Sequence, residues 1–111
     1  MKKITLKDLV LGVDNGNIST NNEVCFSGQV FNKYVSKNPY ERYRFIYGTL
    51  RDKNYAVDCY LLSENCKNEN HYINLASKIK IKKEITIVGL VNKINDDKSF
   101  TVSITDIILD N

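Results

Sequence analysis

The chain has 111 residues, enough for one domain and too few for two ordinary ones. Its 42% hydrophobic and 26% charged residues are typical of a globular domain and argue against disorder, and no apolar run approaches the ~20 residues of a membrane-spanning helix. The 16 lysines and arginines against 13 acids leave a net charge of +3, which is too small to identify a polyanionic partner by itself.

Residues 1–8 carry charges where a secretion signal needs an apolar stretch, so we expect a cytoplasmic protein. In that compartment Cys25, Cys59 and Cys66 are expected to stay reduced. Cys59, Cys66 and the single histidine, His71, lack a fourth ligand at zinc-binding spacing. We therefore expect no metal site and no cofactor.

Three strands are predicted in the first half of the chain. Val24, Phe26 and Val30 alternate with small or polar residues and share one face, and Gly28 predicts a bulge or sharp coil in mid-strand. The strands are expected over 24–31, 43–50 and 55–62, with a loop at 36–41 and a tight turn at 51–54.

A helix and two further strands are predicted in the second half. Tyr72, Leu75, Ala76 and Ile79 fall at i, i+3, i+4 and i+7, the spacing of one buried helix face. Two strands follow over 84–91 and 100–105, joined by a hairpin turn at 95–98. The apolar tail at 107–109 is expected to pack on the core or on a second copy. At the start of the chain, a helix or strand over 4–11 is expected to cover one end of the core.

The predicted order is three strands, one helix and two strands, an all-β fold with one helix. A helix between the third and fourth of five strands describes the OB-fold, a partly open Greek-key barrel. Gly28 and Gly89 sit at matching places in the first and fourth strands, where a small sheet must bend to close on itself. We expect a single OB-fold domain over 1–111, with an N-terminal cap over 1–20 and the barrel over about 22–109.

Four segments of the chain also resemble a known superfamily. The segments 24–30 (VCFSGQV) and 45–52 (FIYGTLRD) resemble the opening of nucleic-acid-binding OB domains. Such domains occur in the anticodon-binding parts of class II aminoacyl-tRNA synthetases and in single-stranded DNA-binding proteins of the replication protein A type. The segments 85–91 and 100–107 resemble the closing hairpin of the same domains. The resemblance covers roughly residues 20–109 and implies oligonucleotide binding across the second and third strands, flanked by two loops.

Strand alternation predicts which side chains face the partner. We expect Ile46, Gly48 and Leu50 inside the barrel, which leaves Tyr43, Phe45 and Tyr47 exposed to stack on bases. On the third strand Asp58 and Tyr60 are expected outside. On the first strand the outward register is Gln29, Phe31 and Lys33, although a bulge at Gly28 reverses it.

Basic side chains near this face are candidates for phosphate contacts. Asp58 opposes the interpretation because it repels phosphate; it could instead accept a hydrogen bond from a base or pair with Arg44 or Arg51. The candidate nucleic-acid-binding residues are Phe31, Lys33, Tyr43, Arg44, Phe45, Tyr47, Arg51, Tyr60, Lys93 and Lys98.

A plainer interpretation stands beside this one. Aromatic residues favour strands for packing alone, and a register slip of one residue would turn Phe45 and Tyr47 into the barrel. Catalysis finds little support, since His71 sits where a helix is expected to start and no P-loop or other catalytic motif occurs. We expect a protein without enzymatic activity and with no catalytic residues.

The leading hypothesis is a protein that binds single-stranded nucleic acid, DNA more than RNA, with little sequence specificity. It would act by aromatic stacking and phosphate neutralisation. An alternative is an OB-fold protein-interaction or adaptor subunit, whose tyrosine-rich face contacts a protein. A binder specific for tRNA or another RNA, and self-association, stay open. No membrane partner is expected.

Overall fold

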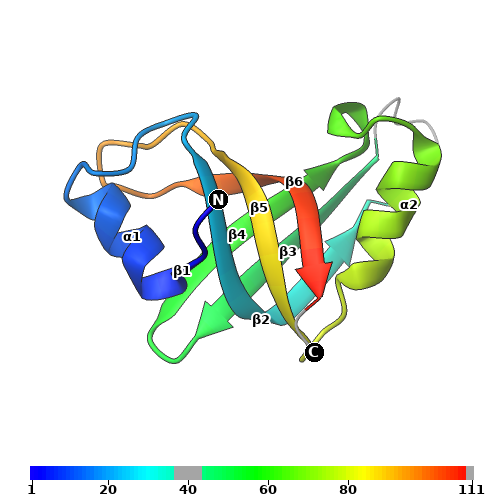
Figure 1. Ribbon diagram of the computed structural model, residues 1–111, viewed down its shortest axis with the longest axis horizontal. Helices are drawn as coiled ribbons and strands as arrows, with labels where there is room; N and C mark the ends of the chain where they lie inside the picture. Colours follow the sequence, from blue (N-terminus) through cyan, green and yellow to red (C-terminus); the bar gives the residue numbers. More distant parts are fainter. Residues whose placement is uncertain (37–43, 110–111) are drawn as a thin grey trace.

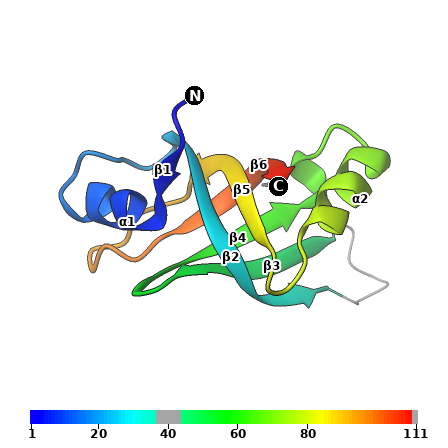
Figure 2. The same ribbon diagram turned by 60° about the horizontal axis from the view of Figure 1, so that its bottom comes forward.

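The computed structural model describes residues 1–36 and 44–109 (Figure 1). Strands dominate the chain, and the two labelled helices lie at opposite ends of the molecule in both ribbon views (Figures 1 and 2). In chain order the elements are β1 (Ile4–Thr5), α1 (Leu6–Asp14), β2 (Glu23–Val35), β3 (Phe45–Asp52), β4 (Tyr55–Leu62), η1 (Ser63–Asn65), α2 (Glu69–Lys78), β5 (Glu84–Val91) and β6 (Thr101–Leu109).

The strands β2 to β6 close into a barrel. β2 is shared between two ladders, pairing antiparallel with β5 through its first half and with β3 through its second half. β3 pairs antiparallel with β4, and β5 with β6, while β4 and β6 run parallel and close the circle. This is the OB-fold barrel expected from the sequence, with α2 between the third and fourth barrel strands as predicted.

The predicted strand limits agree with the observed ones for two of the barrel strands. β4 and β5 have the predicted bounds. β2 and β6 instead continue past their predicted ends, to Val35 and Leu109. In the longer β6, Ile107 is buried in the core, whereas Ile108 and Leu109 are exposed.

The barrel interior is filled by alternate side chains of its strands. On β4, Val57, Cys59 and Leu61 are at most 3% exposed, as predicted, and Ile85 and Ile87 of β5 are fully buried. Burying a side chain such as leucine or isoleucine stabilises a fold by roughly 1.5–3 kcal/mol. The same alternation turns the intervening β4 residues outward, which creates the surface described below.

The N-terminal segment covers one end of the barrel, as predicted, and it does so with a short strand followed by a helix. Thr5 and Asp8 form a capping box, in which the Thr5 hydroxyl accepts a hydrogen bond of 3.0 Å from the Asp8 amide. α1 then buries Leu6, Leu9 and Val13 completely or almost completely. The helix is therefore part of the single hydrophobic core.

α2 packs against the opposite end. The Asn68 side chain accepts a hydrogen bond of 2.8 Å from the His71 amide, and His71 Nδ1 accepts one of 3.1 Å from the Lys67 amide. His71 is thus a helix-start residue, as predicted, while Tyr72 and Leu75 are buried. Within the described ranges no helix has the length and apolarity to cross a membrane.

One of the two predicted bends is in its predicted place. The ladder between β5 and β6 shifts register between Val88 and Gly89. A Cβ atom at Gly89 would lie 2.4 Å from the carbonyl oxygen of Ser103, so only glycine allows the strands to approach this closely. The bend predicted at Gly89 is therefore confirmed.

The bulge in β2 is not at Gly28, where the sequence predicted it. Gly28 stays in register with Ile85, and the shift falls between Val30 and Asn32, which makes Phe31 the extra residue. Gly28 instead leaves room for the Leu6 side chain of α1. The bulge at Phe31 reverses the alternation of every β2 residue after it.

Candidate nucleic-acid interface

The outer surface of β3 carries the aromatic side chains that the alternation predicted. Ile46 and Leu50 face the barrel and are 3% and 1% exposed, whereas Phe45 and Tyr47 are partly exposed on the other side of the strand. The outward direction of these two rings is confirmed, and they do not fill the barrel. Tyr43, the third ring of the predicted row, lies outside the described residues.

Aromatic rings from neighbouring strands meet on this surface, and we call Tyr34, Phe45, Tyr47 and Tyr60 the aromatic cluster. Tyr47 is in register with both Tyr34 of β2 and Tyr60 of β4. The ring centroids of Tyr47 and Tyr60 are 5.1 Å apart, and Phe45 lies 6.3 Å from Tyr60 and 6.1 Å from Tyr34. At these distances tilted rings attract one another. The cluster is therefore one continuous aromatic surface, with Tyr34 58% exposed.

Beside the aromatic cluster lies a polar strip, formed by Asn32, Thr49 and Asp58. The Thr49 amide donates a hydrogen bond of 3.0 Å to Asn32 Oδ1, and the Thr49 hydroxyl donates one of 2.7 Å to Asp58 Oδ1. The partner of Asp58 is therefore Thr49, and neither Arg44 nor Arg51 pairs with it. Because these hydrogen bonds join three adjacent strands, the strip holds a carboxylate in a defined position on the face.

The polar strip also acts on Tyr47 of the aromatic cluster. A hydrogen bond to Thr49 lowers the pKa of the Tyr47 phenol, but burial and the neighbouring carboxylate of Asp58 outweigh that effect and raise the pKa overall. Tyr47 therefore keeps its proton well above neutral pH. It offers a partner a neutral ring and a hydroxyl donor.

Phe31 and Arg51 form a stacked pair on the same face. The guanidinium carbon of Arg51 lies 3.9 Å from the centre of the Phe31 ring, a cation–π contact. Both residues are exposed, Phe31 by 51%. The structure thus brings together two residues that the sequence proposed separately, and it presents an aromatic ring and a positive charge as one unit.

The predicted outward placement of Lys33 is wrong. Because the bulge lies at Phe31, Lys33 comes into register with the inward-facing Gly48. Its ammonium group donates hydrogen bonds to the carbonyl oxygens of Ile79 (2.8 Å) and Ala76 (3.4 Å) at the end of α2. Lys33 is therefore on the opposite side of β2 from the aromatic cluster.

Arg44 also lies away from the aromatic cluster. It forms an ion pair with Glu69 at the start of α2, and its guanidinium carbon is 5.0 Å from the centre of the Tyr72 ring. These contacts join the beginning of β3 to the helix. They give Arg44 a role in holding α2, and they orient its charge toward the helix.

The connection between β5 and β6 borders the face next to Asp58 of β4. Lys98 and Asp58 line one small cavity of about 290 Å³ together with Phe100. Lys98 is exposed and stands next to the polar strip. Lys93 is exposed in the same connection.

β6 extends the face beyond β4. Thr101 and Ser103 are in register with Asp58 and Tyr60. The Asn92 side chain donates a hydrogen bond of 2.8 Å from Nδ2 to the Thr101 hydroxyl, and its Oδ1 accepts one of 2.9 Å from the Ser103 hydroxyl. The face therefore ends in an ordered row of hydroxyl groups.

Sequence reasoning missed several residues of this surface. Tyr34 and Asn32 were absent from the candidates because the first strand was expected to stop at Phe31. Thr49 was not singled out either, and in the structure it is 9% exposed. The hydroxyl-bearing alternation of the last strand was a usable signal for Thr101 and Ser103. Predicting that Tyr34 lies on this face would have required the position of the bulge in β2.

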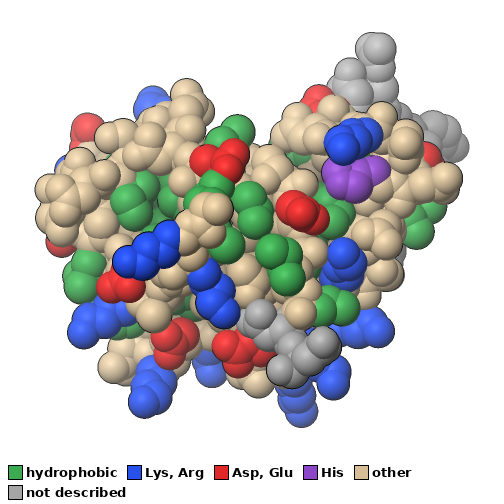
Figure 3. Space-filling model, viewed as in Figure 1, with side chains coloured by type: hydrophobic (Ala, Val, Ile, Leu, Met, Phe, Trp, Pro, Cys, Tyr) green, Lys and Arg blue, Asp and Glu red, His purple; other side chains and the backbone are tan. Residues whose placement is uncertain are grey.

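The side of the molecule formed by β5 and β6 has a different character. Figure 3 views this side, with β3 and β4 passing behind β5 in the matching ribbon of Figure 1. Positive and negative side chains are intermingled there, with scattered hydrophobic groups between them. The exposed aromatic rings of the cluster come from β2, β3 and β4, so the two sides offer different chemistry.

Other reactive side chains are placed for packing. Among the described residues, no group of three or more His, Cys, Asp or Glu side chains could hold a metal ion. Cys25 and Cys59 are buried free thiols, and burial raises the pKa of Cys59 far above its usual value. Cys59 is therefore a core residue with the reactivity of a protonated thiol.

Comparisons with known proteins place this geometry in a fold. No protein-family model and no curated protein matches the chain. Among solved structures the chain is similar to RecG in the structure of RecG bound to a three-way DNA junction, with a TM-score of 0.62 and 15% identity over 99% of this chain and 13% of that one. It is also similar to a chain assigned as an aspartyl-tRNA synthetase from Leishmania major Friedlin, with a TM-score of 0.68 and 9% identity over 96% of this chain and 20% of that one.

The chain thus spans a fifth or less of the length of these two structures. At identities of 9% and 15% the likeness concerns the backbone, and it agrees with the barrel and helix positions described above. The chain therefore has the OB fold that its sequence resembled.

Proposed function

We propose that this chain binds single-stranded nucleic acid, DNA more than RNA, with little sequence specificity and without catalysing a reaction. The observation that carries the proposal is the aromatic cluster on the outer surface of β2, β3 and β4. Tyr34 is 58% exposed and the other three rings are partly exposed, and covering such apolar surface with a partner is favourable. An unpaired base is a suitable partner, because each base presents an aromatic face.

Stacking supplies the sequence-tolerant part of the binding. Each base stacked on an aromatic side chain contributes roughly 1–3 kcal/mol. Tyr34 and Tyr47 lie side by side on adjacent strands, so successive bases can occupy neighbouring rings. In a duplex the base faces are already covered by neighbouring pairs, which is why the cluster favours an unpaired strand.

Phosphate contacts supply the salt-dependent part. Arg51 lies at one end of the face, stacked on Phe31, and Lys98 lies near Asp58 at its border. Each phosphate neutralised on a single strand lowers log K by about 0.7 per tenfold rise in salt. Since few cations of the described residues border the face, we expect a modest salt slope for a strand bound to this face alone.

The structural neighbours are in keeping with this proposal. One is RecG in a complex with a three-way DNA junction, and the other is assigned as a tRNA synthetase. Both names involve nucleic acid, one DNA and the other RNA. Oligo-dT and oligo-U of equal length therefore distinguish binding of DNA from binding of RNA.

Fluorescence anisotropy with a labelled oligo-dT strand tests the proposal. We expect micromolar or tighter binding at low salt that weakens as salt rises, weaker binding of oligo-U, and much weaker binding of a DNA duplex. Absence of oligo-dT binding at low salt would contradict the nucleic-acid function. Tighter binding of oligo-U would reverse the choice of DNA.

A second candidate function is a protein-interaction subunit. The observation that favours it is Asp58, a carboxylate on the face that repels phosphate groups, next to exposed tyrosines that suit a protein partner equally well. The two functions differ in their dependence on salt. Binding of a protein partner through the cluster that is insensitive to salt, with no affinity for oligonucleotides, would favour the second function.

A further inference from the structure

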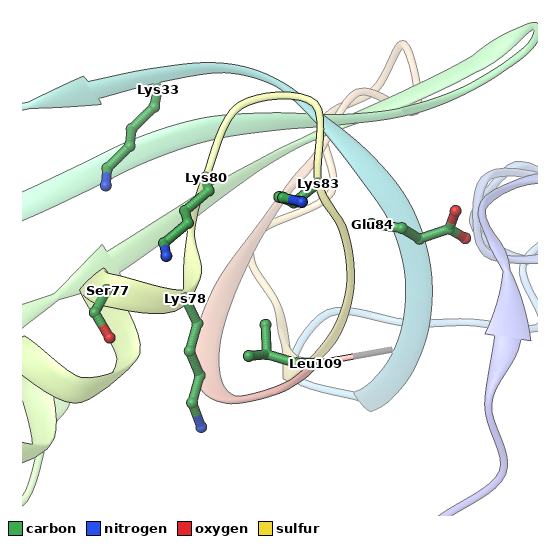
Figure 4. A pocket seen from close by; sticks show the side chains of 7 residues that line it. All are labelled: Lys33, Ser77, Lys78, Lys80, Lys83, Glu84 and Leu109. Carbon is green, nitrogen blue, oxygen red and sulfur yellow. The ribbon is translucent and has the colours of Figure 1, made fainter. Parts of the chain in front are cut away.

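A second surface of the barrel carries a concentration of positive charge. A cavity of about 670 Å³ lies between the end of α2, the start of β5 and the second half of β2 (Figure 4). We call it the lysine pocket, after the four lysines that line it. Its lining comprises Lys33, Lys78, Lys80 and Lys83 together with Ser77, Glu84 and Leu109.

Two of these ammonium groups are fixed in place by the fold. Lys33 donates to the carbonyl oxygens of Ile79 and Ala76 at the carboxyl end of α2, where the helix dipole is negative. Lys78 donates to the Ile107 carbonyl over 3.2 Å. An ammonium has three N–H donors. Each of the two groups therefore keeps a donor for a ligand while its position is already set.

Among the described residues, acids do not balance the remaining charges. Lys80 and Lys83 are exposed, and Glu84 is the single acid of the described lining. In Figure 4 the Glu84 carboxylate points away from the lysine side chains. Four lysines against one glutamate leave three positive charges, equal to the net charge of the entire chain. This excess of positive charge favours an anion in the pocket.

The lysine pocket and the aromatic cluster share an edge of β2. The ladder between β2 and β5 ends at Gln29. The next residue, Val30, still donates to the Lys83 carbonyl and accepts from the Lys82 amide. Past that point Lys33 faces the pocket, while the next residue, Tyr34, belongs to the aromatic cluster. A strand leaving the cluster at Tyr34 has only to cross this edge to reach the lysines.

We infer that the lysine pocket is a second nucleic-acid contact, which binds phosphates of the same strand after it passes Tyr34. This inference rests on the proposed function. It gives a role to the basic cavity that lies beside the aromatic cluster, where the described residues supply few cations. It also assigns the two contacts different chemistry, because the cluster holds bases and the pocket holds the backbone.

The prediction is that the pocket matters only for strands long enough to reach it. The test compares the double variant Lys80→Gln/Lys83→Gln with the control Lys2→Gln/Lys7→Gln, which removes the same charge from exposed positions at the other end of the chain. Anisotropy is measured with oligo-dT of about 5 and about 20 nucleotides, one length near the lower end and one above the ~4–16 nucleotides that a single OB fold covers.

For the long strand, the pocket variant is expected to bind at least tenfold more weakly at low salt. Its salt slope should fall by about 1.4, or about 0.7 for each lost phosphate contact. The short strand should bind the pocket variant and the wild type equally, and the control variant should retain the full slope with both strands. Circular dichroism checks that both variants are folded.

Three results would overturn the inference. Equal losses in the pocket and control variants would assign the effect to net charge. Equal losses for short and long strands would place the lysines within the primary site, and no loss with either strand would leave the pocket without a role. If the wild-type chain binds neither strand, the proposed function fails together with the inference, an outcome distinct from loss of the pocket contact alone.

Discussion

Thr49 and Asp58 face each other across β3 and β4, and the Thr49 hydroxyl donates a hydrogen bond of 2.7 Å to Asp58 Oδ1. The bond fixes a carboxylate beside the aromatic cluster, where bases are proposed to stack. Thr49 uses one of the two carboxylate oxygens, so Asp58 has further acceptor capacity, on which the neighbouring Tyr47 hydroxyl also draws. An exocyclic amino group of a base is a suitable donor, whereas a carbonyl oxygen of a base is repelled.

Replacing Asp58 by asparagine is therefore expected to change base preference. Cytosine presents an amino group at the position where thymine presents a carbonyl. A hydrogen bond contributes roughly 0.5–1.5 kcal/mol net, so the wild type should bind oligo-dC up to about tenfold more tightly than oligo-dT, a preference that comes from the one base beside Asp58. In Asp58→Asn this preference should disappear, and oligo-dT should bind more tightly than it binds the wild type.

Competition anisotropy with the two oligonucleotides measures the change. Asparagine keeps an oxygen that can accept the Thr49 hydrogen bond, so the local structure is preserved. An identical dC to dT ratio in the wild type and the variant would remove Asp58 from any contact with bases.

Stacking predicts a larger loss when the rings themselves are removed. The double variant Tyr47→Thr/Tyr60→Thr keeps β-forming residues on both strands but deletes two adjacent rings. At roughly 1–3 kcal/mol per base, affinity for oligo-dT should fall about 100-fold or more. The measurement is anisotropy at constant low salt, with thermal unfolding to establish that the barrel survives.

Ile108→Thr provides the matched control. Ile108 is 50% exposed on the part of β6 that pairs with β5, so its replacement removes apolar surface away from the aromatic cluster. The control should bind oligo-dT as the wild type does. Equal weakening of both variants would mean that the loss reflects apolar surface in general and that the rings do not stack on bases.

The sequence predicted the barrel well because the periodic strands have strongly differentiated faces. Val57, Cys59 and Leu61 are apolar at every second position, which determines both the limits of β4 and its outward side. The same logic correctly turned Phe45 and Tyr47 outward. Where burial separates two faces, a register error would place a whole row of apolar side chains in water.

The parts that sequence reasoning missed depend on a single extra residue in β2. The outward placement of Lys33 assumed unbroken alternation from Gln29 to Lys33, whereas the register shifts at Phe31. Every residue of the strand after Phe31 is therefore on the face opposite to the one expected. Lys33 faces α2 and Tyr34 belongs to the aromatic cluster, and nothing in local propensity predicts a bulge at Phe31.

The close approach at Gly89 predicts a stability effect. In Gly89→Ala the new methyl group would lie 2.4 Å from the Ser103 carbonyl oxygen, a backbone atom that cannot move independently. We expect a loss of about 1–3 kcal/mol in the free energy of unfolding. Denaturant unfolding measures it.

Gly12→Ala is the matched control for this substitution. Its methyl group would lie 2.6 Å from Cδ1 of Ile18, the end of a flexible side chain, and alanine improves helix propensity in α1 by up to about 1 kcal/mol. The control should therefore unfold within about 1 kcal/mol of the wild type. Equal stability of Gly89→Ala and the wild type would show that the β5–β6 ladder tolerates a side chain at this position.

A pH-dependent contribution is predicted in the connection between β5 and β6. The Ser99 hydroxyl, and then the Ser99 backbone amide, donate to Asp97 Oδ1 and lower the pKa of that carboxyl group. Because the pKa is lower in the folded than in the unfolded state, the stabilisation is present above the unfolded value and is lost as pH falls through the folded one. In Ser99→Ala the pKa of Asp97 should move up toward the ordinary value.

Carbon-13 NMR titration of the side-chain carboxyl groups follows this change. Ser77→Ala, which removes a hydroxyl bonded to the Asn74 carbonyl on α2, should leave the titration of Asp97 unchanged. If Asp97 titrates identically in the wild type and Ser99→Ala, the hydroxyl does not stabilise its charged form.

Two-dimensional NMR during addition of a short oligo-dT strand shows whether bases stack on the aromatic cluster. We predict saturable shifts concentrated on Tyr34, Phe45, Tyr47 and Tyr60, with the aromatic protons moving upfield as bases stack over the rings. The account is contradicted if no resonances shift at low salt, or if the shifts fall on the β5–β6 side while the four rings stay unchanged.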